Sequence, residues 1–257
     1  MNIGLIGGGA IATFLLEEIH QKNIKNVYIR SVLVRDVQKY AHLEEYGVTL
    51  YADAHEFADS NIDFVVEAST VEAVRNTIPT ILQKKDVGLI SVGALVDGDF
   101  LQELKDIAIR HNRSLYLPSG AIGGLDLLQN AQALGGVNRV TLKTRKPAHT
   151  LIEEKLTAEK VIFSGSARAA IAEFPKNVNV AIVLSLAGVG MDATEVQVIA
   201  DPTTDKNTHT IHIEGTFGTS EMTVTNEPLP SNPRTSYLAA MSVLHLCINH
   251  TENIQIG

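Results

Sequence analysis

A glycine-rich segment near the amino terminus has the residue types needed to bind a pyrophosphate. The run Gly7-Gly8-Gly9-Ala10-Ile11-Ala12 fits the pattern G-x-G-x-x-(G/A) and follows a strand-like apolar run at 3–6. Gly7 permits a tight turn, Gly9 lets phosphates approach the backbone, and the start of the following helix offers free N–H groups. Ala12 is small enough for that helix to pack closely on a sheet. The segment therefore predicts a dinucleotide site, rather than a turn without a ligand, with contacts from Gly7, Gly9, Ala10 and Ile11.

The turn after the second strand-like run carries two charged residues, Arg35 and Asp36. In dinucleotide-binding folds this turn lies beside the ribose next to adenine. An acidic residue there accepts hydrogen bonds from the 2′-hydroxyl of NAD, whereas an arginine can pair with the 2′-phosphate of NADP. The two residues therefore leave both NAD and NADP open as the cofactor, and an exposed charged turn is the alternative for each.

Three further loops follow strand-like runs and are made largely of small residues: Glu67-Ala68-Ser69-Thr70, Ser91-Val92-Gly93-Ala94 and Pro118-Ser119-Gly120-Ala121. Open α/β sheets bind ligands beyond the carboxyl ends of their strands, where a ribose or nicotinamide must lie close to the backbone. An ordinary turn has a similar composition. The residues expected to contact the cofactor in the first two loops are Ala68, Ser69, Ser91 and Gly93.

One of the nine histidines, His209, lies in the segment Asn207-Thr208-His209-Thr210-Ile211-His212-Ile213. In a strand, Asn207 and His209 share one face with two isoleucines, while His212 and Glu214 lie on the other. His209 would then stand at the polar end of a buried face, which suits a catalytic base, although the spacing alone favours an ordinary core histidine. His212 is expected to face solvent or pair with Glu214. Because His209 and His212 point to opposite faces, we expect no metal site.

The first half of the chain alternates strand-like and helix-like segments. Strands are expected at 3–6, 27–34, 48–51, 63–68, 87–92 and 114–117, and helices at 11–19, 71–82 and 97–110. Strands separated by helix-length segments imply βαβ units, and right-handed crossovers place helices on both faces of a parallel sheet. We expect residues 1–118 to form a dinucleotide-binding domain of the Rossmann type, with a doubly wound α/β fold.

The second half of the chain changes in character. Period-two alternation occurs at 139–145, 194–200, 208–217 and 220–225, and helix-like patterns occur at 126–133, 167–174, 177–186 and 235–248. Period-two alternation is typical of half-buried antiparallel strands. We expect residues 119–234 to form an α+β substrate and catalytic domain with a mostly antiparallel sheet, and the helix within 235–257 to pack back on the first domain.

The composition limits the classes of protein that this chain can be. It has 257 residues, of which 45% are hydrophobic and 19% charged, enough apolar material for a core. A net charge of −8 without a basic cluster argues against nucleic-acid binding. No apolar run approaches the roughly 20 residues of a membrane span, and no secretion signal is apparent. The single cysteine, Cys247, excludes an internal disulfide and Cys-based zinc sites, so we expect a soluble, cytoplasmic protein.

Several longer blocks resemble the L-aspartate dehydrogenase family. They are the segments at 91–95, 117–126, 174–181, 200–202, 207–209 and 232–236, which occur in order through nearly the whole chain and are more specific than the glycine pattern. The resemblance implies NAD(P)-dependent oxidative deamination of L-aspartate to iminoaspartate or oxaloacetate plus ammonia, or the reverse reductive amination. Such an enzyme can supply iminoaspartate for pyridine nucleotide biosynthesis. The resemblance also implies a homodimer, formed through the antiparallel sheet of the second domain.

Carried across residue by residue, the family's active-site histidine falls on His209, and further cofactor contacts fall on Ala121 and Asn179. The family usually has lysine where Arg234 stands, and these two cations differ in geometry. Oxidising an α-amino acid requires a neutral amine, and forming oxaloacetate adds water to an imine, so one base with a pKa near neutrality can serve both steps. The resemblance therefore favours His209 as the general acid/base.

The substrate's two carboxylates require cations or well-placed donors. Solvated surface charge is the alternative interpretation for each candidate cation. The residues expected to bind the substrate are Ser119, Lys176, Asn207 and Arg234, and the other groups considered are Lys143, Thr144, Arg145 and Lys146.

Two other functions remain open from the sequence. A Rossmann dehydrogenase acting on another amino acid or a semialdehyde, such as homoserine dehydrogenase, would share the two-part plan, and fold alone does not separate these enzymes. A redox sensor that binds NAD(P) without catalysis would keep Gly7 and Gly9 but would have no need of His209.

Overall fold

The computed structural model describes residues 1–22, 24–175 and 179–254, which form two compact units. Unit 1 consists of Met1–Pro118 together with residues 240–254. Unit 2 comprises Ser119–Ala239. Within the described residues, the helices are too short or too polar for any of them to span a lipid bilayer.

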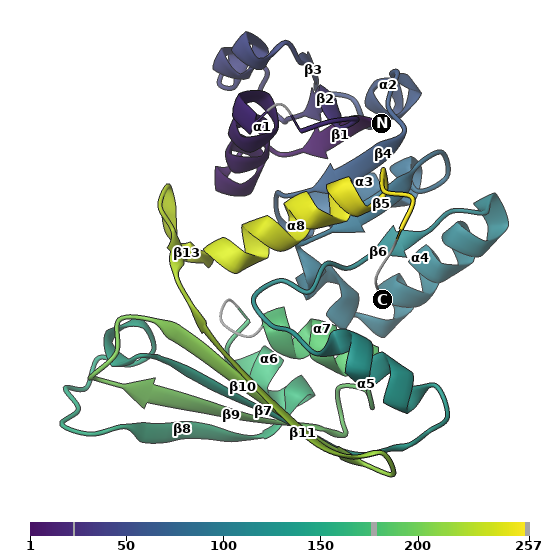
Figure 1. The fold of residues 1–257 in the computed structure, drawn as a ribbon. Helices are drawn as coiled ribbons and strands as arrows, with labels where there is room; N and C mark the ends of the chain where they lie inside the picture. The colour runs from purple at the N-terminus through teal and green to yellow at the C-terminus, as the bar shows by residue number, and fades with distance from the viewer. Residues whose placement is uncertain (23, 176–178, 255–257) are drawn as a thin grey trace. The chain divides into compact units, whose positions relative to one another are not determined.

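Unit 1 is built on a six-stranded parallel sheet (Figure 1). Its strands are β1 (Asn2–Ile6), β2 (Tyr28–Leu33), β3 (Thr49–Tyr51), β4 (Phe64–Glu67), β5 (Asp86–Leu89) and β6 (Leu115–Tyr116). The spatial order is β3-β2-β1-β4-β5-β6, and each neighbouring pair is parallel. Strands β2 and β3 are added on one side of β1, and strands β4 to β6 are added on its other side, so the strand order reverses between β1 and β4. Ligands of open α/β sheets bind beside such a reversal.

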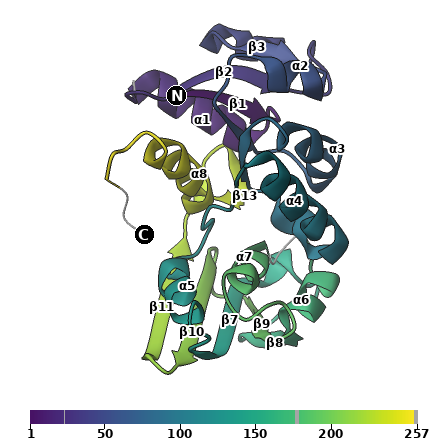
Figure 2. The ribbon, with the colours of Figure 1, turned by 90° about the vertical axis from the view of Figure 1, so that its right-hand side faces the viewer.

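Helices cover both faces of the unit 1 sheet, which confirms the predicted doubly wound Rossmann-type fold. They are α1 (Ala10–Lys22), α2 (Ala54–Asp59), α3 (Val71–Ile81) and α4 (Gly98–His111), with 3-10 turns η1 (Ala41–Tyr46) and η2 (Val92–Val96). Figures 1 and 2 show α2, α3 and α4 on one face and α1 on the other. The short α2 was not expected from the sequence. Its signal is the cap at Asp53, whose carboxylate accepts hydrogen bonds from the backbone N–H groups of His55 and Glu56.

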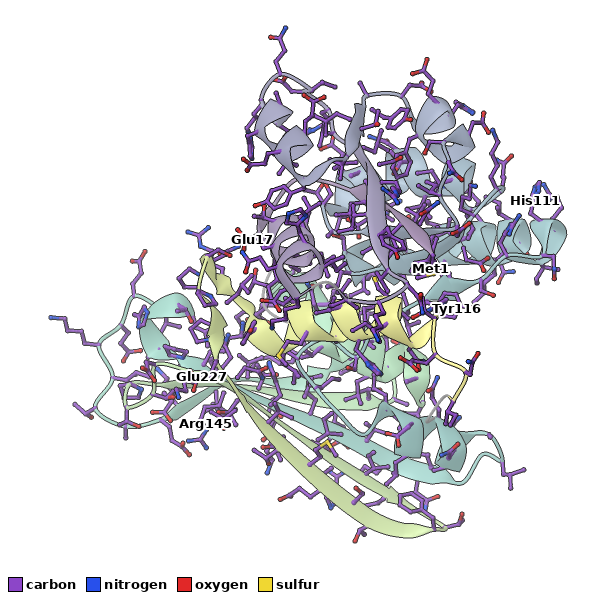
Figure 3. The ribbon with its side chains drawn as sticks, turned by 45° about the horizontal axis from the view of Figure 1, so that its top comes forward. Met1, Glu17, His111, Tyr116, Arg145 and Glu227 are labelled. Carbon is purple, nitrogen blue, oxygen red and sulfur yellow. The ribbon has the colours of Figure 1, made fainter. Side chains whose placement is uncertain are left out.

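The last helix, α8 (Tyr237–Asn249), begins in unit 2 and continues into unit 1. In unit 1 it packs against β5, where a Cβ on Gly88 would lie 2.8 Å from Leu246 Cδ2. Just beyond the helix, the His250 ring lies 4.6 Å from the Tyr116 ring between centroids, and Figure 3 shows Tyr116 beside this end of α8. The only cysteine, Cys247, is fully buried in the same helix.

Unit 2 contains a five-stranded sheet of order β11-β10-β7-β9-β8. The strands are β7 (Val137–Pro147), β8 (Lys160–Ser166), β9 (Thr194–Asp201), β10 (Asn207–Gly215) and β11 (Gly218–Asn226). Only the β7–β9 pair is parallel, so the prediction of a mostly antiparallel sheet is confirmed. The edge strand β8 was missed because none of its residues is buried, and it therefore shows no apolar alternation.

The helices α5 (Leu125–Gln132), α6 (Ala167–Glu173) and α7 (Asn179–Ala187) lie on one face of this sheet (Figures 1 and 2). We call this the inner face. It carries the buried residues Val140, Leu142, Thr144, Val196, Val198, His209, Ile211 and Ile213. Because apolar side chains dominate it, a polar group placed there is kept from water.

Two smaller elements of unit 2 precede α8. The strands β12 (Pro228–Leu229) and β13 (Asn232–Ser236) form a two-stranded antiparallel sheet. The expected start of the last helix at 235 was therefore two residues too early, since Thr235 and Ser236 belong to β13. One further 3-10 turn, η3 (Ala148–Thr150), follows β7.

Candidate functional site

The glycine turn of unit 1 has the backbone geometry that its sequence predicted. Gly7 has φ of 100°, and its N–H donates a hydrogen bond to Leu33 O at 2.9 Å. A Cβ on Gly7 would lie 2.8 Å from both Ala68 O and Ser69 Cβ. Gly9 is exposed, and a Cβ there would have no atom within 4 Å. The turn thus leaves open space above Gly9 at the start of α1.

A cleft of about 680 Å³ lies beside this turn, within unit 1. Of the expected cofactor residues it is lined by Gly7, Gly9, Arg35, Asp36, Ala68 and Ser69. It also includes Thr70 of the loop at 67–70, and residues that the sequence did not single out, among them Lys39, Tyr40, Asn76 and Thr77. The size is that of a small-molecule site, and the open backbone at Gly9 fits a pyrophosphate.

Other expected cofactor residues lie outside this lining. Ala10 and Ile11 are half-buried in the first turn of α1. Ser91 and Gly93 are half-buried beyond β5, and a Cβ on Gly93 would lie 2.9 Å from Val71 Cγ2. Ala121 and Asn179 belong to unit 2, where Ala121 is buried and Asn179 is exposed at the start of α7.

The two charged residues of the turn after β2, Arg35 and Asp36, have different partners. Asp36 Oδ1 accepts a hydrogen bond from Lys39 N at 3.1 Å, so this carboxylate closes the local turn. Arg35 is exposed, and its Nη1 lies 3.8 Å from Glu72 Oε2 in an equally exposed pair. Such a pair contributes little to stability and leaves the guanidinium available to a ligand.

Glu67, the last residue of β4, is fully buried at the carboxyl end of the unit 1 sheet. Its carboxylate accepts hydrogen bonds from four donors of the two following loops, given as donor–acceptor distances: Ser69 N (2.7 Å), Ser91 Oγ (2.8 Å), Ser91 N (2.9 Å) and Ile90 N (3.3 Å). Burial raises the pKa of Glu67, and these donors act in the opposite direction. The sequence analysis placed Glu67 in a candidate ligand-binding loop but gave it no role, although a lone acid ending an apolar strand was a visible signal.

In unit 2, His209 lies on the inner face of the sheet, 5% exposed. Its Nδ1 is 3.1 Å from Thr144 Oγ1, which lies directly across the β7–β10 pair. Alternation along the strands puts Lys146 on the face of Thr144, and Asn207 on the face of His209. On the opposite face His212 Nδ1 lies 3.4 Å from Glu214 Oε1, as the sequence suggested.

The inner face controls the protonation of these groups. Burial and, to a smaller extent, the ammonium group of Lys146 lower the pKa of His209 to about 4. Burial lowers the pKa of Lys146 to about 8. At neutral pH the imidazole is therefore uncharged and able to accept a proton, while the lysine is largely cationic.

A buried amide connects the loop containing Ala121 to the sheet. Asn226, at the end of β11, donates from Nδ2 to Ala121 O at 3.1 Å and accepts from Ser236 Oγ at 2.6 Å. Register pairs Asn226 with Asn207, so this amide lies beside the end of the strand that carries His209. The sequence analysis missed Asn226, because the residue to which it donates, Ala121, lies far away along the chain.

The expected substrate-binding residues occupy different surroundings. Ser119 and Asn207 are half-buried, Arg234 is exposed on β13, and Lys176 lies outside the described residues. Arg145, labelled in Figure 3, pairs with Asp201 at 3.0 Å and with Glu159. Lys143 is exposed on the face opposite His209. Of the cations considered that the structure describes in unit 2, Lys146 is the one that shares the inner face with His209.

The described residues contain no group of three His, Cys, Asp or Glu side chains placed to hold a metal ion.

The burial of His209 predicts a specific pH dependence of stability. The unfolded chain protonates this histidine near its ordinary pKa of about 6.5, whereas the folded protein does so only near 4, so folding stability is lost as the pH falls between these values. Urea denaturation gives the free energy of unfolding at pH 7 and at pH 4.5. Between these two pH values His209→Asn should lose about 2–3 kcal/mol less of this free energy than the wild type loses. The exposed His111→Asn should keep the full wild-type loss. Equal losses in all three proteins would contradict a neutral, buried His209.

Comparisons with known proteins agree with this geometry. The sequence model described as "Homoserine dehydrogenase, NAD binding domain" matches residues 7–118, and that described as "Aspartate dehydrogenase, C-terminal" matches 126–250. L-aspartate dehydrogenase of Methanosarcina mazei is 43% identical over 77% of each chain. That of Methanocaldococcus jannaschii is 35% identical over 100% of this chain and 99% of its own.

Solved structures give the same result. Aspartate dehydrogenase of Thermotoga maritima has a TM-score of 0.80 and 29% identity, covering 100% of this chain and 99% of its own. Scyllo-inositol dehydrogenase of Lactobacillus casei with bound NAD(H), at 13% identity and a TM-score of 0.59 over 100% and 91% of the two chains, shares the fold alone.

Fold and site together define a Rossmann-type oxidoreductase that uses a pyridine nucleotide. Within that class, the chain belongs to the L-aspartate dehydrogenase family, whose members act on a CH–NH2 group. Its similarity to the homoserine dehydrogenase family lies in the cofactor-binding half.

Proposed function

We propose that this protein is an NAD(P)-dependent L-aspartate dehydrogenase, which converts L-aspartate to iminoaspartate, and then to oxaloacetate and ammonia, and which also runs in reverse. The observation that carries the proposal is the buried, uncharged His209 beside Lys146, in a member of this family. Unit 1 supplies the dinucleotide site and unit 2 the acid/base and substrate groups.

The cofactor site in unit 1 is formed by the glycine turn and the cleft beside it. Gly7 and Gly9 bring the backbone to the pyrophosphate, and Ala68 and Ser69 line the same cleft. Ala10, Ile11, Ser91 and Gly93 complete the expected contacts, with Ala121 and Asn179 from unit 2. A pyridine nucleotide held by these residues would supply the acceptor for the hydride that leaves the substrate's Cα.

His209 acts as the general acid/base. In this assignment its Nδ1–H donates to Thr144 Oγ1, which leaves Nε2 free to accept a proton. That proton comes first from the substrate ammonium, because hydride loss needs the neutral amine, and later from the water that adds to the imine. In the reverse reaction, the protonated imidazole returns it.

Lys146 is the cation we assign to a substrate carboxylate, with Asn207 as a neutral donor on the same face. A carboxylate beside Lys146 offsets the ammonium charge that lowers the pKa of His209. Substrate binding would thereby bring the imidazole closer to the range in which it exchanges protons efficiently. Ser119, Lys176 and Arg234 are retained as proposed contacts for the second carboxylate.

Among the two cofactors, we propose NADP as the preferred one. The only carboxylate of the turn after β2 that lines the cleft, Asp36, is bonded to Lys39 N, while the Arg35 guanidinium is exposed at the cleft. Arg35→Ala should raise KM for NADP by about 10- to 100-fold and change KM for NAD by less than about twofold. Arg30→Ala, an exposed arginine on β2 outside this cleft, is the control. Equal effects of Arg35→Ala on both cofactors would contradict the assignment.

The decisive test of function is turnover. Purified protein is mixed with NAD or NADP and a panel of L- and D-amino acids including L-homoserine, and reduced nicotinamide is followed by absorbance. We expect turnover with L-aspartate alone, and in reverse with oxaloacetate and ammonia. Cofactor binding without turnover in either direction would instead support a redox sensor.

Two wider aspects belong to the same proposal. The iminoaspartate formed is a precursor suited to pyridine nucleotide biosynthesis.

The protein is also proposed to act as a homodimer. We assign the dimer contact to the face of the unit 2 sheet opposite His209, which carries Arg139, Thr141, Lys143 and His212. Sedimentation equilibrium measures the assembly state directly.

A further inference from the structure

Glu67 is a buried carboxylate at the point where three strands of unit 1 end. In the parallel register it pairs with Ile6 of β1 on one side and with Leu89 of β5 on the other. Its two oxygens therefore lie between the loop after β4 and the loop after β5. Burying a carboxylate costs free energy, so such a group persists where the surrounding structure uses it.

The hydrogen bonds to Glu67 require a group that accepts only. Oε1 receives Ser69 N and Ser91 Oγ, and Oε2 receives Ser91 N and Ile90 N. A glutamine in this place would set its NH2 group against two of these N–H or O–H donors. The arrangement is therefore specific for a carboxyl group rather than for any polar side chain of this length.

These hydrogen bonds determine the conformation of the loops after β4 and β5. They also determine whether the Ser91 hydroxyl acts as a donor or an acceptor towards a ligand. The loop after β4 contacts the glycine turn, since a Cβ on Gly7 would lie 2.8 Å from Ala68 O. Ser91 Oγ donates its only proton to Glu67, so towards any ligand it acts as an acceptor. The matching ligand group is a hydrogen-bond donor, such as a ribose hydroxyl or a carboxamide NH2.

We propose that Glu67 is a positioning residue for the cofactor: it holds the loops at 68–70 and 90–93 in the conformation that receives the nicotinamide riboside half, and it fixes Ser91 as an acceptor for that half. This inference rests on the proposed use of a pyridine nucleotide. Glu67 makes no contact with the cofactor in this role and acts through Ser69 and Ser91.

The test compares the whole cofactor with a fragment that lacks the nicotinamide riboside. Dissociation constants of NADPH, and of NADH, are measured by fluorescence, and that of ADP by competition, for wild type and Glu67→Gln. We expect Glu67→Gln to weaken NADPH and NADH binding by at least about tenfold and ADP binding by less than about twofold. Ser91→Ala, which keeps the backbone donors, should weaken the whole cofactor less and leave ADP unchanged.

Ser31→Ala is the matched control, because Ser31 is also buried in unit 1 and bonds to Ser60 Oγ at 2.9 Å. Ser31→Ala should lower thermal stability, but it should not weaken binding of NADPH or NADH more than it weakens binding of ADP. Equal weakening of both ligands by Glu67→Gln, or no weakening, would overturn the proposal. Should Glu67→Gln not fold, Ser91→Ala decides alone, and unchanged NADPH and NADH binding in that variant would overturn the proposal, because Glu67 is proposed to act through Ser91. Since no step uses aspartate, a wild type that binds NADPH or NADH but does not oxidise aspartate refutes only the proposed function.

Discussion

Replacing His209 with asparagine is expected to lower kcat for L-aspartate oxidation by about 10²- to 10⁴-fold, the usual contribution of a positioned acid/base. Asparagine keeps a polar group opposite Thr144 but has no nitrogen that can take up a proton in this pH range. Because the dinucleotide site is assigned to unit 1 and His209 belongs to unit 2, NADPH and NADH affinity should stay within about twofold of the wild type. Stopped-flow and steady-state absorbance measurements give both quantities.

The control for His209→Asn is His111→Asn, at the exposed end of α4, where Figure 3 labels the residue. This variant should keep the wild-type kcat. The pH profile gives a second readout: the wild-type limb that reports His209 should be absent in the residual activity of His209→Asn. A His209→Asn enzyme with kcat within tenfold of the wild type would exclude His209 as the acid/base.

Replacing Gly9 with valine should weaken cofactor binding by about 100-fold or more while changing the free energy of unfolding little. No atom lies within 4 Å of the Cβ position of Gly9, so the protein itself has room for the side chain. The valine would fill the space assigned to the pyrophosphate and separate it from the backbone N–H groups, each worth about 1.5–3 kcal/mol to a charged acceptor. Calorimetric titration with NADPH and NADH, together with urea denaturation, separates the two effects.

Two other glycines calibrate the Gly9→Val experiment. Gly7→Ala places a side chain in a left-handed region and against Ala68 O, so it should lose stability as well as affinity, by about 1–3 kcal/mol. Gly98→Ala, exposed in the first turn of α4 with open space around its Cβ position, should change neither quantity appreciably. Full cofactor affinity in Gly9→Val would place the pyrophosphate elsewhere.

Much of the fold was predictable because it depends on local patterns. The apolar runs of β1, β4 and β5 and the helices between them imply a parallel sheet. The glycine pattern at 7–9 predicts the tight turn because a glycine can adopt the positive φ found at Gly7. Period-two alternation along β10 correctly separated His209 from His212, because strand geometry alone assigns faces. Short or exposed elements, such as α2 and β8, carry too few buried residues to show a period.

Much of the candidate site was not predictable, because its partners are distant along the chain. Thr144 lies 65 residues from His209, and Ala121 lies 105 residues from Asn226. Glu67 was named as part of a candidate loop but received no role, because a charged residue beside a loop is usually solvated and its burial depends on the loop after β5. Lys146 was one of several cations, and the face it occupies becomes meaningful only once β7 is paired with β10.

The discontinuity of unit 1 has a consequence for the order in which the protein can mature. A ribosome makes residues 1–118 first, then the whole of unit 2, and only afterwards the part of α8 that packs on Gly88. Until Leu246 emerges, the apolar surface near β5 that α8 covers is exposed to solvent. It stays exposed for the time needed to translate more than a hundred residues. Completion of the Rossmann half is therefore a late event, and we expect nascent chains that stop before α8 to bind chaperones.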